Sequence, residues 1–217
     1  SKHLLIIAFE SADHDKSHSL KRALEIVEEY QGIFEEPKES KDAHRSGSSG
    51  SWRSSFIRAP YLRESFTRRG IIQDTFETAI TWDKSHKFIE NIKNQAAKAI
   101  LEITGKPSLI TCRITHSYPD GLAPYFTFGA FSTPQSMIEI WKEIKLATNE
   151  ICIANQGTVT HHHAVGRDHR PKGYDDQRPD LFNKVLVAAK SSLDPKGIMN
   201  PGVLIDPEGK NISNWMA

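Results

Sequence analysis

A cluster of histidines and arginines in the last third of the chain is the clearest chemical feature of the sequence. Four imidazoles and two guanidiniums fall within residues 161–170. Three of the imidazoles are consecutive: His161, His162 and His163. The run is internal and follows Thr158-Val159-Thr160, so a purification tag does not explain it. Because histidine titrates near neutral pH and titratable groups cluster at functional sites, the run predicts an active-site wall that handles protons and anions.

A metal site is a second interpretation of this run, and structural or surface histidines are a third. On an extended backbone His161 and His163 would share one face, and His162 would lie on the other. Zinc sites are completed by further cysteine, histidine or carboxylate ligands. Neither a cysteine nor a tight pair of acids lies near the run in the sequence. These absences count against a metal, and no metal ligand is assigned to the predicted site, although the metal interpretation stays open.

A tyrosine in a predicted strand adds a second group that exchanges protons. Within Leu122–Phe131, Phe126 and Phe128 face one side, and Tyr125 and Thr127 face the other. Tyr125 is then either a half-buried cross-strand residue or a phenol directed into a pocket. Together with the imidazoles, it would suit proton transfer beside an anionic substrate.

Arginines mixed with aromatic residues form a third feature, in Trp52–Arg69. An arginine supported by aromatic neighbours can hold a carboxylate or phosphate through two hydrogen bonds. A solvated basic face explains most of these side chains equally well. The five arginines are Arg53, Arg58, Arg63, Arg68 and Arg69.

Hydrophobic periodicity predicts the elements that position these groups. Alternating or short apolar runs predict strands at residues 4–9, 71–82, 109–116 and 122–131. Helical spacing predicts helices at residues 17–31, 88–103 and 133–155, and one that starts at Pro179. The Ser/Gly-rich segment at residues 38–51 is expected to be a mobile loop. This order predicts an α+β fold, in which helices cover a mainly antiparallel sheet.

The totals restrict the class of protein. The chain has 217 residues and a net charge of +1, which does not indicate nucleic acid or a membrane surface as the main partner. The 2 cysteines, Cys112 and Cys152, form no disulfide framework and suit a reducing compartment. No G-x-G-x-x-G, P-loop or G-x-S-x-G motif is present. The chain starts without Met and enters an apolar run at once, so a fragment of a longer protein is expected.

Several pieces of the sequence resemble the alkyldihydroxyacetonephosphate synthase family. They are His161–Arg167, Thr111–Tyr118, Tyr125–Phe128, and Thr75–Thr78 with Trp82-Asp83. The closing pieces, Leu193–Pro195 and Asn200–Gly202, resemble the tail of the wider vanillyl-alcohol-oxidase type of FAD-linked flavoproteins. The resemblance spans nearly the whole chain.

The resemblance implies an FAD enzyme of ether-lipid synthesis. Family members exchange the acyl group of acyl-dihydroxyacetone phosphate for a long-chain alcohol and release a fatty acid. The flavin holds the substrate through its N5 atom without net redox change. The resemblance also implies a ferredoxin-like cap domain followed by a C-terminal helical tail.

The same resemblance assigns roles to five residues. Tyr125 matches the catalytic tyrosine, and the three histidines at 161–163 match an essential catalytic triplet beside the flavin. His162 and His163 are the members of the triplet expected to contact the cofactor. Arg63 matches the arginine that binds the substrate phosphate.

The resemblance divides the chain into two expected regions. Residues 1–157 would form the cap, which binds substrate, and residues 158–217 would carry the histidine motif and a tail that packs toward an upstream FAD-binding domain. Without that domain the fragment is expected to be inactive. The expected location is cytoplasmic in a bacterium and peroxisomal in a eukaryote. A homodimer and a peripheral membrane contact are left open.

Two other functions compete with the synthase. The chain could be the cap of an FAD-linked 2-hydroxy-acid dehydrogenase or oxidase, or a non-catalytic binding domain derived from either enzyme. The hydroxy-acid relatives usually carry a single His-Gly pair, whereas this chain has three consecutive histidines, which favours the synthase.

Overall fold

The computed structural model describes residues 3–35, 45 and 47–206, and the chain divides into two compact units, Ser1–Tyr61 and Leu62–Ala217. The first unit contains α1 (Ser17–Glu29) and most of α2 (Gly47–Thr67). Asp15 stabilises the start of α1, because its Oδ1 accepts hydrogen bonds from the Ser17 amide and hydroxyl at 3.2 and 2.8 Å. The helix predicted at residues 17–31 is thus confirmed.

Two expectations for the first unit are wrong. Residues 4–9 form no strand, and Leu4 and Leu5 are exposed. A strand needs partners for its backbone groups, and the described part of this unit provides only helices. The expected mobile loop at 38–51 is also too long, because residues 47–51 begin α2, and the next turn is held by Trp52 and Phe56, which stack at 5.6 Å. Residues 38–44 and 46 lie outside the described residues.

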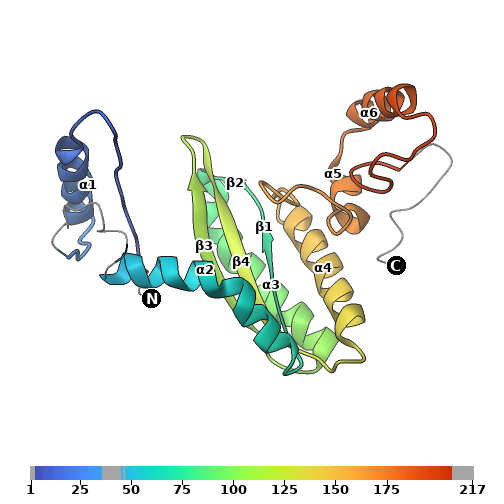
Figure 1. Ribbon diagram of the computed structural model, residues 1–217, viewed down its shortest axis with the longest axis horizontal. Helices are drawn as coiled ribbons and strands as arrows, with labels where there is room; N and C mark the ends of the chain where they lie inside the picture. The colour runs from blue at the N-terminus through green and yellow to red at the C-terminus, as the bar shows by residue number, and fades with distance from the viewer. Residues whose placement is uncertain (1–2, 36–44, 46, 207–217) are drawn as a thin grey trace. The chain divides into compact units, whose positions relative to one another are not determined.

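The second unit is built on a four-stranded antiparallel sheet. Its central strand, β4 (Gly121–Phe131), pairs with β1 (Ile71–Glu77), β2 (Ile80–Thr81) and β3 (Leu109–Ser117) (Figure 1). The single strand predicted at 71–82 is interrupted between β1 and β2. At this point the Thr78 hydroxyl and the Ala79 amide donate hydrogen bonds to Thr158. The α+β class and the antiparallel sheet are confirmed.

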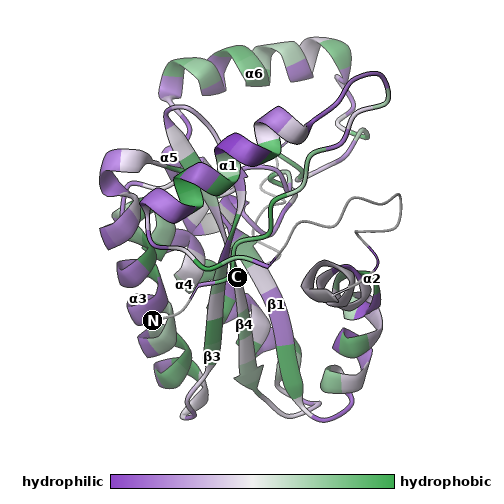
Figure 2. Cartoon of the chain, turned by 90° about the vertical axis from the view of Figure 1, so that its left-hand side faces the viewer, coloured by the Kyte–Doolittle hydropathy of each residue, from purple (hydrophilic) through white to green (hydrophobic). Residues whose placement is uncertain are grey.

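Helices α3 (Ser85–Thr104) and α4 (Met137–Ala154) cover one face of this sheet (Figure 1). Figure 2 shows hydrophobic and hydrophilic residues alternating along α3, which is the pattern of a helix with one buried face. Phe76 and Phe126 stack at 4.9 Å in the core, where each fully buried phenylalanine contributes roughly 2–3 kcal/mol. Gly105 ends α3 in the left-handed conformation.

The opposite face of the sheet carries polar side chains. Strand alternation places Gln73, Thr75 and Glu77 of β1 on this face, because Ile72 and Phe76 point into the core. From β3 and β4 the same face receives Arg113, Tyr125 and Thr127. An antiparallel sheet can face water on one side, so polar side chains are expected on the face opposite α3 and α4.

Three arginines tie the end of the described chain to the segment that follows the histidine run. This segment contains a π-helical turn at Arg170–Tyr174, α5 (Asp175–Gln177) and α6 (Asp180–Leu193). Arg167, Arg170 and Arg178 donate to the carbonyls of Pro201, Gly202 and Leu204 at 2.7, 3.0 and 2.8 Å. Arg170 is buried and also pairs with Asp206 at 2.9 Å.

The helical tail expected after Pro179 is confirmed as α6. Among the described residues, no helix has both the length and the apolar character needed to cross a membrane.

Candidate active site

The histidine run starts at the break between β1 and β2. The Thr78 hydroxyl donates to the Thr158 carbonyl at 2.6 Å, and the Thr158 hydroxyl accepts the Ala79 amide at 2.8 Å. Gly157 precedes this contact and cannot be replaced without rearrangement, since a Cβ there would lie 2.5 Å from the Phe88 ring. These contacts fix the chain at the edge of the sheet immediately before the histidines.

Glu77 holds the histidine run through one carboxylate oxygen. Its Oε1 accepts the Thr160 hydroxyl at 2.6 Å and the backbone amides of three consecutive residues. Those amides belong to His161 at 2.6 Å, His162 at 2.8 Å and His163 at 3.0 Å. Successive amides that point to one anion require a curved backbone. The extended conformation considered for the run is therefore wrong. The backbone of the three histidines curves around the Glu77 carboxylate.

Glu77 is fully buried and ionised. Burial by itself would raise the pKa of this carboxyl group. The hydrogen bonds from the Thr160 hydroxyl and the three histidine amides oppose burial and lower the pKa to about 2. A permanent negative charge consequently lies beneath the histidine rings, with Oε2 3.2 Å from the His162 Nδ1.

Tyr125 lies between two charged residues in one row across the polar face. It is the cross-strand partner of Glu77 in β1 and of Arg113 in β3. The Arg113 guanidinium stacks over the Tyr125 ring at 4.5 Å from the centroid, a cation–π arrangement. Strand register therefore places an anion on one side of the tyrosine and a cation on the other.

The structure brings the predicted tyrosine and histidines together. The Tyr125 ring lies 5.2 Å from the His163 ring, edge on, and 6.0 Å from the His162 ring. Its hydroxyl donates to the Thr75 Oγ1 at 3.2 Å. Burial lowers the pKa of His163, so its imidazole is neutral at pH 7 and can either donate or accept a proton.

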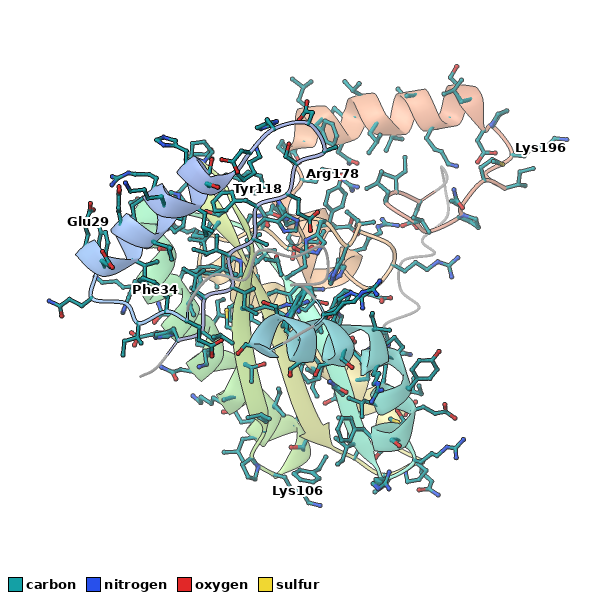
Figure 3. The ribbon with its side chains drawn as sticks, turned by 60° about the vertical axis from the view of Figure 1, so that its left-hand side comes forward. Glu29, Phe34, Lys106, Tyr118, Arg178 and Lys196 are labelled. Carbon is teal, nitrogen blue, oxygen red and sulfur yellow. The ribbon has the colours of Figure 1, made fainter. Side chains whose placement is uncertain are left out.

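His116 and Tyr118 join this cluster, and the analysis of the sequence did not select them. The His116 ring lies 4.7 Å from the His162 ring, and the Tyr118 hydroxyl lies 3.1 Å from the His161 Nε2. Tyr118 marks the β3–β4 hairpin, at the opposite end of the sheet from Lys106 (Figure 3). The family resemblance could have identified them, because both residues lie in Thr111–Tyr118, one of the segments that resemble the family.

Buried polar residues of α4 support the site from the edge of β1. Lys145 is 4% exposed, and its ammonium donates to the Thr75 carbonyl at 3.0 Å. Burial lowers the pKa of Lys145, while the charges of Asp74 and Asp168 oppose this effect. The Trp141 Nε1 donates to the Asp74 Oδ2 at 2.6 Å and holds that carboxylate against α4.

His169 is the buried member of the histidine cluster. Its Nδ1 lies 3.2 Å from the Asn149 Oδ1, and burial and the Lys145 charge lower its pKa to about 4. The neutral imidazole therefore donates its Nδ1 proton to the amide oxygen. His169 is a structural residue rather than a second proton carrier.

Arg63 is the predicted phosphate ligand. None of the interactions described for it involves Tyr125 or the histidines. It is exposed on α2, and its charge is one of those that lower the Lys145 pKa. Its backbone carbonyl accepts the Thr67 hydroxyl at 2.9 Å. The arginine side chain remains available on the helix surface near a buried cation.

Comparison with known proteins places this arrangement in a family. The family described as "FAD linked oxidases, C-terminal domain" matches residues 1–204, and the chain belongs to it. The chain is 30% identical over 156 residues to an alkyldihydroxyacetonephosphate synthase from Trypanosoma brucei brucei, covering 71% of this chain and 25% of that protein. It is 32% identical over 148 residues to the enzyme of the same name from Caenorhabditis elegans, covering 67% and 25%.

A solved structure of alkyldihydroxyacetonephosphate synthase has the same fold. Its TM-score is 0.50 at 20% identity, and the match covers 72% of this chain and 25% of that chain. The chain thus spans about a quarter of the length of the relatives it matches. The chain is a C-terminal domain of the FAD-linked oxidase family and is similar to alkyldihydroxyacetonephosphate synthases, so the family resemblance seen in the sequence is confirmed.

FAD is the cofactor that family membership implies. The residues present fit such a group. His162 and His163 are exposed, and the ring nitrogens of a histidine can offer an N–H donor and a lone pair to the polar edge of a flavin ring. The Tyr125 hydroxyl adds a third exchangeable proton beside them.

Proposed function

We propose that this domain forms the substrate side of an FAD-dependent alkyldihydroxyacetonephosphate synthase. The enzyme would exchange the acyl group of acyl-dihydroxyacetone phosphate for a long-chain alcohol in ether-lipid synthesis. The carbon–oxygen bond to the acyloxy group breaks, the fatty acid leaves as a carboxylate, and the alcohol oxygen forms the new ether bond. The relatives that carry this name support the proposal.

One observation carries the proposal at the level of residues. Tyr125 pairs with Glu77 across the sheet, and its phenol lies beside the His162 and His163 rings. These histidines are more than thirty residues away from Tyr125 in the sequence. In this proposal Tyr125 moves the proton at the substrate carbon, and neutral His163 exchanges the proton with the phenol. His161 and His162 complete the wall, in positions fixed by Glu77.

The remaining roles concern binding. Arg63 would hold the substrate phosphate through its two-pronged guanidinium, and the neighbouring Lys145 would add positive charge to that region. When bound, FAD would supply a ring that holds the substrate without net oxidation. His162 and His163 would orient that ring and exclude water from the face that Tyr125 lines.

Anaerobic absorbance of the full-length protein with FAD tests the proposal. Lactate, glycolate and 2-hydroxyglutarate are added in turn, followed by a long-chain acyl-dihydroxyacetone phosphate with hexadecanol. The expected result is an unbleached flavin with the hydroxy acids and release of fatty acid from the acyl substrate. Bleaching by a hydroxy acid would identify a dehydrogenase instead, and the absence of both signals would favour a non-catalytic binding domain.

A further inference from the structure

Within the described part of the chain, the Tyr125 hydroxyl makes one hydrogen bond, to a threonine of the neighbouring strand. The phenol donates to the Thr75 Oγ1 at 3.2 Å. Strand register explains this contact, because Thr75 lies on the same sheet face as Glu77, which is the direct cross-strand partner of Tyr125. Diagonal neighbours of this kind are within reach of an aromatic side chain. Thr75 therefore sets the direction of the Tyr125 hydroxyl.

The other groups around Tyr125 contact its ring rather than its oxygen. Arg113 stacks over the face of the ring, at 4.5 Å from the centroid. The centroids of the His163 and His162 rings lie 5.2 and 6.0 Å from that of the phenol ring. The contact with Thr75 is consequently the one that orients the exchangeable proton.

Thr75 itself is held firmly in the sheet. It lies directly opposite Thr127 where β1 pairs with β4. Its carbonyl oxygen also accepts a hydrogen bond at 3.0 Å from the ammonium group of Lys145, a buried residue of α4. A shift of this part of β1 would take the partner away from a buried charge, which is unfavourable. A hydroxyl on such a rigid support can hold a neighbouring phenol in one orientation.

The Thr75 hydroxyl has a hydrogen of its own to donate. It accepts the bond from Tyr125, and within the residues that the structure describes it donates to no acceptor. A hydroxyl carries one donor and two acceptor positions, and rotation can turn its hydrogen toward the phenol oxygen. Thr75 can thus serve both forms of Tyr125, as an acceptor for the neutral phenol and as a donor to the phenolate.

We propose that Thr75 is a positioning residue for proton transfer by Tyr125, an inference that rests on the acid/base role of Tyr125 in the proposed function. The phenol proton passes to the His163 ring, and the Thr75 hydroxyl turns to donate a hydrogen bond to the phenolate. The phenolate then takes the proton from the substrate carbon, and the electron pair of that C–H bond stays on the substrate.

The protons balance over the cycle. When Tyr125 returns a proton to the substrate carbon, His163 gives its proton back and restores the phenol. Thr75 neither gains nor loses a proton, and only the direction of its hydrogen bond reverses. Valine has nearly the same shape as threonine and can make neither form of this bond.

Fatty-acid release by the full-length protein with FAD, measured over a range of acyl-substrate concentrations, tests the inference. Thr75→Val should lower the limiting rate by about ten- to a hundredfold, because a hydrogen bond to a charged oxygen is lost. The Michaelis constant should stay within about twofold, because Thr75 acts through Tyr125 and not on the substrate. Thr75→Ala, which also lacks the hydroxyl, should be as slow.

Two further variants separate the hydroxyl from the shape of the side chain. Thr75→Ser keeps the hydroxyl and should restore the limiting rate to within about threefold of the parent. Thr111→Val is the matched control, because Thr111 lies opposite Thr127 on β3 and has no described bond to Tyr125. It should leave both kinetic constants unchanged.

A double-mutant cycle on urea unfolding measures the hydrogen bond without any turnover. Thr75→Val and Tyr125→Phe remove the two ends of one bond, so their effects on stability should not add. The unfolding equilibrium constant of the double variant should differ by about two- to tenfold from that expected for independent changes. Additive effects would show that the bond is absent and would overturn the inference.

Three kinetic results would also overturn it, and they are distinguishable. A Thr75→Val rate within about twofold of the parent, together with a slow Tyr125→Phe, would exclude the role of Thr75 and leave that of Tyr125 intact. An equally slow Thr75→Ser would show that packing, and not the hydroxyl, is needed. Turnover by Tyr125→Phe within about tenfold of the parent would remove the role of Tyr125 first, and that of Thr75 with it.

Discussion

The Glu77 carboxylate contacts His162 twice. Its Oε1 accepts the His162 backbone amide at 2.8 Å, and its Oε2 lies 3.2 Å from the His162 Nδ1. A single buried side chain thus fixes both the backbone and the ring of a residue that lies 85 positions later in the sequence. The geometry of the candidate site depends on this contact.

Glu77→Gln should destabilise the protein by roughly 2–3 kcal/mol. The amide keeps the shape of the side chain, but it removes the negative charge that the four donors share. Urea unfolding of the full-length protein measures the change. The control is Glu90→Gln on the exposed side of α3, which should change stability by less than about 0.5 kcal/mol. Equal effects in the two variants would show that the anchoring role is wrong.

Tyr125→Phe should lower turnover of the acyl substrate by more than about tenfold, a barrier change near 1.4 kcal/mol. The ring keeps its stacking with Arg113 and His163, so only the exchangeable proton and the bond to Thr75 are lost. Steady-state release of fatty acid is the measurement. Tyr174→Phe removes a hydroxyl from a tyrosine that stacks with Arg178, and should leave turnover nearly unchanged. Turnover within tenfold of the parent in Tyr125→Phe would exclude an acid/base role.

Arg63→Lys should raise the Michaelis constant for the phosphorylated substrate and leave the limiting rate nearly unchanged. Lysine keeps the positive charge but loses the planar pair of donors that matches a phosphate. Initial rates over a range of substrate concentrations separate the two constants. Arg68→Lys, on the same helix and paired with Glu64, is the control. An unchanged Michaelis constant in Arg63→Lys would rule out the phosphate contact.

Stability should fall as the pH is lowered from about 6.5 toward 4, partly because of His169. Its pKa is about 4 in the folded chain and 6.5 as an ordinary value, so the unfolded state binds the proton first. The stability present above pH 6.5 is lost as the pH falls through this window, by up to roughly 3 kcal/mol for this one buried group.

His169→Asn provides the test of that pH dependence. Asparagine can still donate to the Asn149 Oδ1, but it does not titrate. Unfolding free energies at several pH values between 4 and 7 should therefore show a shallower slope for the variant. A slope identical to that of the parent protein would mean that other groups cause the loss of stability.

Local patterns in the sequence were sufficient to predict most of the second unit. Alternation along residues 122–131 placed Phe126 and Phe128 in the core and Tyr125 on the other face, and the burial of these residues agrees. Helical spacing at residues 88–103 predicted α3, which the structure extends to Ser85–Thr104. These predictions succeed because side-chain direction follows backbone period, which neighbouring residues set.

Predictions that required a partner were less successful. The apolar residues 4–9 have the composition of a strand, but strand formation depends on a second strand, and the described residues of that unit supply none. The strand predicted at 71–82 is interrupted for the opposite reason, because Thr158 competes for the backbone at Ala79. Local periodicity reveals neither the missing partner strand nor the competing threonine.

The sequence by itself determined which residues could exchange protons: the three consecutive histidines and Tyr125, whose types and local pattern mark them. Only the tertiary structure decided how they are arranged. Strand register sets Tyr125 between Glu77 and Arg113, and the curved run turns three amides toward one carboxylate. It also adds His116 and the buried Glu77 oxygen to the histidine rings. The physical reason is that hydrogen bonds and charges act over a few ångströms of space, whereas these groups are separated by up to 86 residues of chain.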